Sequence, residues 1–160
     1  METTAPSRRA LRPTFVNVVF VLLVIGVGGL IGTQSLPDAW YEGLGKPFFT
    51  PPNWVFGPVW LLLYVLIGVA GGRTFLRGPV SLAMGIWVVQ MLLNWVWSPV
   101  WFTLHQLWWA FVIVSAMWLS IAAFVAATWR SDRPAALMFL PYLAWVSFAG
   151  LLNLSVALMN

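Results

Sequence analysis

The feature that most constrains this chain is a long stretch without charge, because no Asp, Glu, Lys or Arg occurs between Arg77 and Arg130. As a helix this stretch would measure roughly 75 Å at 1.5 Å per residue, which is enough for two crossings of a hydrocarbon core about 30 Å thick. Only 8% of the 160 residues are charged and 61% are hydrophobic, whereas a soluble domain carries about a quarter charged residues. We therefore expect an all-α protein embedded in a membrane.

The spacing between charged clusters predicts a bundle of five transmembrane helices. The segment 103–106 divides the uncharged stretch, and the prolines of PFFTPP move the start of the second helix to about Trp54. Gly71-Gly72 is expected to end that helix. The expected spans are about 14–34, 54–72, 79–102, 107–129 and 135–159. Residues 1–13 then form a cytoplasmic tail and residues 14–160 a single five-helix domain.

Basic residues mark one side of the predicted bundle. They precede the first span, join the second to the third and join the fourth to the fifth: Arg8, Arg9, Arg12, Arg73, Arg77, Arg130 and Arg133. The opposite side carries Asp38, Glu42, Lys46 and His105. Because basic loops stay in the cytoplasm, we expect the N-terminus inside and the C-terminus outside. Membrane orientation accounts for the net charge of +4, so no nucleic-acid partner is expected.

Several kinds of chemistry are disfavoured. The absence of Cys excludes disulfides, thiolate-bound zinc, iron–sulfur clusters and thiol nucleophiles. The predicted spans contain no ionisable group of the kind that ion-coupled pumps use. We interpret the lone His105 as a loop residue rather than a catalytic base or a haem ligand. No metal site and no required cofactor is predicted.

The segment between the first two spans, residues 35–53, is rich in proline, glycine and aromatic residues, including Trp40 and Tyr41. Four prolines stiffen the segment, and its aromatic side chains favour packing against the mouth of the bundle. We interpret it as a lid over a ligand site. The alternative is an aromatic anchor at the membrane interface.

One face of the third span combines aromatic and amide side chains. Trp87, Gln90, Asn94, Trp97 and Trp101 recur at three- and four-residue steps, so they share one side of a helix. Because an unpaired amide in hydrocarbon is costly, this face is expected to point inward.

The fifth span repeats this pattern and the second offers two more aromatics. The residues are Tyr142, Trp145, Ala149 and Asn153, with Trp60 and Tyr64. An interior of aromatic and neutral polar groups suits a large, flat, mainly apolar ligand with a polar edge. The alternative is that Gln90, Asn94 and Asn153 only hold helices together.

Pairs of small residues four apart permit close approach of helices. One such pair on the third span, Ser81 and Gly85, is a possible dimer seam. The other pairs are Gly28 with Gly32 and Gly68 with Gly72.

Three long motifs carry a family resemblance. They are WYEGLGKPFFTPPNWVFGPVWLLLY from Trp40, QMLLNWVWSPVWF from Gln90 and LPYLAWVSFAGLLN from Leu140. With them the chain closely resembles the translocator protein family, the tryptophan-rich sensory proteins related to the mitochondrial peripheral benzodiazepine receptor. The resemblance implies a multi-pass, usually homodimeric five-helix membrane protein. It also implies an aromatic cavity under the first long loop that binds porphyrin-type tetrapyrroles such as protoporphyrin and haem, and sterols or related apolar ligands.

The resemblance also implies site residues and a range of functions. The family's cavity residues correspond to Trp54, Asn94, Trp97, Trp109, Trp145 and Ala149. The leading hypothesis is a receptor or sensor for porphyrins. The alternatives are a light-dependent porphyrin-degrading enzyme, with Trp54 and Trp145 as its catalytic residues, and a translocator of tetrapyrrole, lipid or sterol. The end of the fifth span lacks the Tyr and basic residue of the eukaryotic sterol segment, so we expect a bacterial cell-membrane protein.

Overall fold

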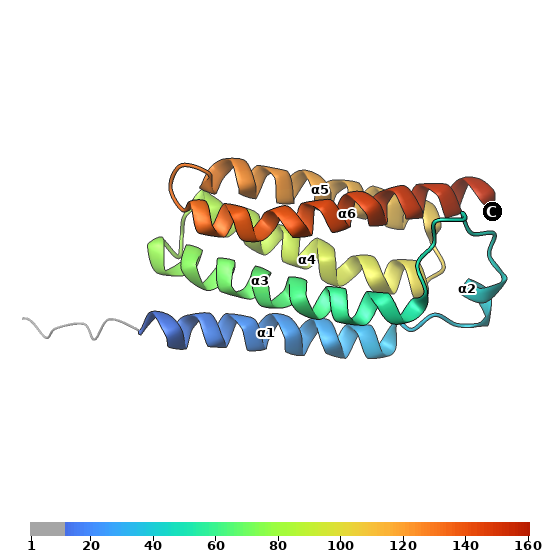
Figure 1. Ribbon diagram of the computed structural model, residues 1–160, viewed down its shortest axis with the longest axis horizontal. Coiled ribbons are helices and arrows are strands. Elements are labelled where there is room, and N and C mark those ends of the chain that lie inside the picture. Colours follow the sequence, from blue (N-terminus) through green and yellow to red (C-terminus); the bar gives the residue numbers. More distant parts are fainter. Residues whose placement is uncertain (1–11) are drawn as a thin grey trace, which may run out of the picture.

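A computed structural model describes residues 12–160, and these form an all-helical bundle (Figure 1). The long helices are α1 (Pro13–Gln34), α3 (Phe56–Arg77), α4 (Leu82–Phe102), α5 (Leu107–Thr128) and α6 (Arg133–Met159). A short helix, α2 (Ala39–Gly43), and a 3-10 turn, η1 (Asn53–Val55), lie between α1 and α3. Five helices are long and apolar enough to cross a membrane, so the predicted five-span bundle is confirmed. The expected tail lies outside the described residues except for its last two.

Side chains and prolines define where two of the helices begin. Ser81 Oγ accepts a hydrogen bond from the backbone N–H of Met84 at 3.2 Å and caps α4. Asp132 caps α6 by accepting from Ala135 N at 3.4 Å, and Pro134 stands in the first turn, where its missing N–H costs nothing. Ser81 therefore has a local structural role.

α3 continues five residues past Gly71-Gly72, so the predicted end of this helix is wrong. Both glycines are buried: Gly72 faces Asn17 of α1, and Gly71 lies against Trp87 of α4 and Phe20 of α1. A Cβ atom on Gly68 would lie 2.6 Å from the Cα of Val21, and one on Gly72 would meet the side chain of Asn17. These glycines are a seam that lets two helix backbones approach closely, and that packing outweighs their weak helix propensity.

The other paired small residues differ in whether a neighbouring side chain lies against them. Gly28 packs under the ring of Tyr64, which extends the seam between α1 and α3. Nothing lies within 4 Å of a Cβ built on Gly32 or Gly85. Gly85 is exposed on α4, and the dimer seam at this position stays a prediction.

The core lies where α3, α4, α5 and α6 meet, and α1 covers the outer side of α3. The face of α4 that combines aromatic and amide residues is buried throughout, including Trp87, Gln90, Asn94, Trp97 and Trp101. The prediction that this face points inward is confirmed. Helix α4 therefore supplies the central wall of the interior.

The bundle has two distinct ends (Figure 1). At the basic end, the start of α1, the end of α3 and the turn between α5 and α6 bring together Arg12, Arg73, Arg77, Arg130 and Arg133. At the lid end lie the α1–α3 connection with α2, the α4–α5 loop and the last turns of α6.

Candidate functional site

A hydrogen-bonded network occupies the centre of the bundle. Asn94 Nδ2 on α4 donates to Tyr142 Oη on α6 at 2.9 Å, and Tyr64 Oη on α3 donates to Asn94 Oδ1 at 3.2 Å. Tyr142 Oη in turn donates to the sulfur of Met117 on α5 at 3.3 Å. One asparagine thus links three helices directly and a fourth through Tyr142.

A second amide lies nearer the lid end. Trp97 Nε1 donates to Asn153 Oδ1 at 3.3 Å, and Asn153 Nδ2 donates to the carbonyl of Leu107 at 2.9 Å. Gln90 differs, because its Nε2 donates only to Trp87 O of the same helix at 2.9 Å. Asn94 and Asn153 therefore join helices, which is the role that the second interpretation of these amides gives them. Gln90 joins no second helix.

Aromatic rings surround the Asn94 network. The ring of Trp60 lies 5.4 Å from Tyr64 and 6.3 Å from Tyr142. Trp145 is half-buried and meets Phe56 edge-on at 5.7 Å. Offset and edge-to-face contacts at these separations are the favourable geometries for aromatic pairs. The inward faces of α4 and α6 carry six of the predicted site residues: Gln90, Asn94, Trp97, Tyr142, Trp145 and Ala149.

Several buried polar atoms of the bundle lack protein partners. Within residues 12–160, the indole N–H groups of Trp95, Trp101 and Trp145 are buried without an acceptor, and Gln90 Oε1 is buried without a donor. A buried polar group that makes no hydrogen bond costs about 1–3 kcal/mol. The interior therefore offers donors to a ligand that carries carboxylate or carbonyl oxygens.

Two residues assigned to the cavity by resemblance lie elsewhere. Trp54 is 75% exposed in η1, before α3 joins the bundle, and Trp109 is 65% exposed on α5. The buried face of α5 begins with Ala110 and Val114, and Trp109 points away from that face because adjacent helical residues differ by about 100° in direction. The structure therefore does not bring Trp54 and Trp109 into the interior with Trp145.

The predicted lid packs on the end of the bundle. Tyr41 is buried against Phe102 at 5.3 Å, and Trp40 stacks on His105 of the α4–α5 loop at 4.0 Å. Asp38 Oδ2 lies 3.2 Å from His105 Nε2, and Asp38 Oδ1 accepts from Tyr41 N at 3.0 Å. The backbone hydrogen bond from Tyr41, together with the charge of His105, lowers the pKa of Asp38 from its ordinary value of 3.8. His105 thus connects the lid to the α4–α5 loop, a contact that sequence reasoning missed.

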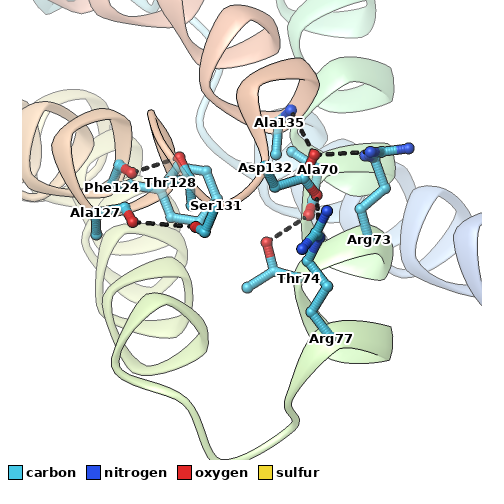
Figure 2. Close-up of polar contacts among 10 residues, drawn as sticks. All are labelled: Ala70, Arg73, Thr74, Arg77, Phe124, Ala127, Thr128, Ser131, Asp132 and Ala135. Carbon is cyan, nitrogen blue, oxygen red and sulfur yellow. Dashed lines mark hydrogen bonds and ion pairs between the residues drawn. The ribbon is translucent and has the colours of Figure 1, made fainter.

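The buried carboxylate of Asp132 forms ion pairs with two partly exposed arginines and closes the basic end (Figure 2). Asp132 is only 2% exposed and accepts from Arg73 Nη2 at 2.7 Å and from Arg77 Nε at 3.1 Å. Burial raises the pKa of Asp132, but the hydrogen bond and charge of Arg73, with help from Arg77, hold it below 3.8. Sequence reasoning missed this contact, although opposite charges in two loops on the same predicted side were its signal. The cluster fastens α3 to α6 at the end opposite the lid.

A shallow groove of about 510 Å³ lies on the outer surface between α5 and α6, away from the Asn94 network. Trp118 Nε1 donates to Ser147 Oγ at 2.7 Å beside it. The groove is lined by Val114, Ser115, Trp118, Leu119, Val146, Ser147 and Gly150. None of these seven was predicted as a site residue.

Comparison with known proteins matches residues 17–159 to the model of the TspO/MBR family. The chain is 37% identical to Protein CrtK of Rhodobacter capsulatus, over 82% of this chain and 85% of that protein. It is 35% identical to the tryptophan-rich protein TspO of Archaeoglobus fulgidus, over 89% and 94%, and 37% identical to the translocator protein of Ovis aries, over 88% of each. With five apolar helices and matches over most of its length, this chain is a multi-pass membrane protein that belongs to the TspO/MBR family.

Proposed function

We propose that this protein is a membrane receptor or sensor that binds porphyrin-type tetrapyrroles between α3, α4 and α6, beneath the lid. The observation that carries the proposal is the Asn94 network, with the ring of Trp60 beside it and the unpartnered indole N–H of Trp145 on the same inward face of α6. A tetrapyrrole is large, flat and apolar, and its carboxylates and ring nitrogens provide polar edges. Such a molecule matches an aromatic site with a few oriented polar groups.

Each part of this interior has a role in the proposed complex. The indole of Trp145 stacks on the ligand and its N–H donates to a carboxylate, which removes the cost of an unpartnered donor. Asn94 orients the polar edge. Because Trp145 contacts Phe56, the ligand must separate these two rings as it enters. Release of the lid from His105 opens the way to them.

The names of two relatives support the broader class. One is called a tryptophan-rich sensory protein and another a translocator protein, so sensing and movement of a ligand are the activities that relatives suggest. We further propose that the basic end faces the cytoplasm, because its five arginines lie on one side of the five spans.

A titration tests the proposal. Protoporphyrin is added to the purified protein in detergent, and quenching of tryptophan emission is followed in the dark. The proposal predicts saturable quenching with a defined stoichiometry, whereas quenching that rises linearly and equally for free tryptophan would overturn it. Illumination of the same samples then separates binding from degradation, because only an enzyme makes the porphyrin absorbance fall faster than that of free pigment.

A further inference from the structure

The segment from Leu44 to Asn53, which we call the strap, passes from α2 across the last turns of α6 to the start of α3 at the lid end of the bundle (Figure 1). At its start, Gly45 N donates to Asn160 Oδ1 at 2.9 Å and Asn160 Nδ2 donates to Gly45 O at 3.0 Å. Further along, the ring of Phe49 lies 6.3 Å from that of Phe148. The contacts therefore move from the end of α6 to a position about three turns earlier.

The position of Phe148 sets the depth of the strap in the membrane. The Asp132 ion pair marks the charged boundary at the other end of α6, because ionised groups are excluded from hydrocarbon. From Asp132 to Phe148 a helix rises roughly 24 Å, which is less than the about 30 Å thickness of the hydrocarbon core. Phe49 therefore contacts α6 at a level that lies within the membrane.

The backbone of the strap suits such surroundings. Pro47, Pro51 and Pro52 have no N–H group to leave unpaired. Thr50 satisfies both of its donors within the strap, because its N and Oγ donate to Pro47 O at 3.0 Å and 2.8 Å. Irregular backbone at membrane depth is tolerated where it packs against protein, and Phe49 packs against Phe148 of α6.

The side chains of the strap divide between the bundle and its surroundings. Phe49 is half-buried against α6, whereas its neighbour Phe48 is fully exposed. The adjoining surface of α6 is apolar too, since Leu151 and Leu158 are exposed. The only charged residue in the strap is Lys46, near its start, where Nζ donates to Glu42 O at 3.1 Å beside α2. The charge of Lys46 thus lies toward the lid end of the molecule, and the exposed phenyl ring of Phe48 lies deeper in the membrane.

We propose that the strap is a lipid-binding surface, with the ring of Phe48 inserted among the acyl chains of the bilayer. We infer lipid as the partner because the exposed apolar surface of α6, which faces lipid, continues directly onto the strap. The lid is then held by the bilayer as well as by His105 and Asn160. This inference does not depend on which ligand the interior binds.

The chain contains no cysteine, so single labelling sites test the proposal. A fluorophore is attached to Phe48→Cys in the full-length protein, which is then reconstituted in phosphatidylcholine vesicles. Quenching by a lipid carrying a nitroxide near the top of its acyl chain is compared with quenching by aqueous iodide. Two matched sites calibrate the ratio of lipid quenching to iodide quenching. They are Leu62→Cys on the exposed, apolar side of α3 and Glu42→Cys at an exposed position of α2.

The proposal predicts that the lipid-to-iodide quenching ratio at position 48 is several-fold above that at position 42 and nearer to that at position 62. A ratio nearer to that at position 42 would overturn it. Phe48 is fully exposed and its ring meets that of its neighbour Phe49 edge-on at 5.5 Å, so its replacement leaves the bundle core intact and the variant is expected to fold. No tetrapyrrole is present, so the result is independent of ligand binding.

Discussion

Asn94 Nδ2 and Tyr142 Oη lie 2.9 Å apart at the centre of the bundle, and this hydrogen bond joins α4 to α6. Tyr64 of α3 bonds to the same asparagine. At this pair, a structural role and the proposed ligand-binding role coincide. The same amide that holds three helices together is the group that we propose orients a ligand. Replacing it therefore affects both stability and binding.

We predict that Asn94→Leu lowers the free energy of unfolding by about 2 kcal/mol, because the hydroxyls of Tyr64 and Tyr142 lose a buried partner. Thermal unfolding in detergent measures this. Gln90→Leu is the matched control on the same helix, since Gln90 bonds only to its own helix and its Oε1 is unpartnered. Gln90→Leu is expected to be neutral or stabilising, and equal losses for the two variants would contradict the network.

The glycine seam between α1 and α3 predicts a contrast between two alanine substitutions. Gly68→Ala places a methyl group 2.6 Å from the Cα of Val21, so a helix backbone must shift at a cost of about 1–3 kcal/mol. Gly32→Ala meets nothing within 4 Å and is expected to stabilise α1 by up to about 1 kcal/mol. Unfolding midpoints of the two variants measure the contrast, and the same sign for both would show that the seam is misplaced.

The ion pair at the basic end predicts a dependence on pH. Because the pKa of folded Asp132 lies below its ordinary value of 3.8, its contribution to stability is complete above that value. The contribution is lost as the pH falls through the folded pKa. Asp132→Asn is expected to cost about 2 kcal/mol at pH 7, less than the roughly 3–5 kcal/mol of a fully buried pair, because both arginines stay partly exposed.

Unfolding of the wild type and Asp132→Asn is measured between pH 7 and pH 3. The difference between the two proteins is expected to shrink toward the acid end of this range. Arg130→Gln is the control, because Arg130 is exposed near the same turn. A constant difference across the range would mean that Asp132 does not act through its charge.

The lid contacts predict a graded loss of order in α2. His105→Ala removes the stack on Trp40 and the contact with Asp38. Asp38→Ala removes that contact and also the cap on Tyr41 N. Hydrogen exchange at residues 39–43 is expected to be faster in His105→Ala than in the wild type, and fastest in Asp38→Ala. Unchanged exchange in both variants would rule out this attachment of the lid.

The spans and the inward face of α4 were predictable because their signals are local. The absence of charge between Arg77 and Arg130 limits the possible boundaries, and the spacing of Gln90, Asn94 and Trp97 selects one side of a helix. Within the hydrocarbon core, an amide side chain finds hydrogen-bond partners only if it faces the interior of the bundle. Such features need no knowledge of distant residues.

The remaining features depend on contacts between distant segments. Gly71-Gly72 has the local signal of a helix end, but packing by α1 reverses it. Asp132 meets Arg73 across 59 positions of sequence, and the strap follows α6 because Gly45 pairs with Asn160 across 115. Trp54 was assigned to the interior by resemblance alone, and its exposure depends on where α3 begins.

The most direct test of the account compares protoporphyrin binding by two tryptophan variants. Trp145→Ala removes a half-buried indole whose N–H is unpartnered, whereas Trp109→Ala removes an exposed one. Loss of stacking and of one hydrogen bond predicts a Kd raised about tenfold or more for Trp145→Ala, with no change for Trp109→Ala. Unchanged affinity in Trp145→Ala, or equal losses in both, would contradict an interior tetrapyrrole site.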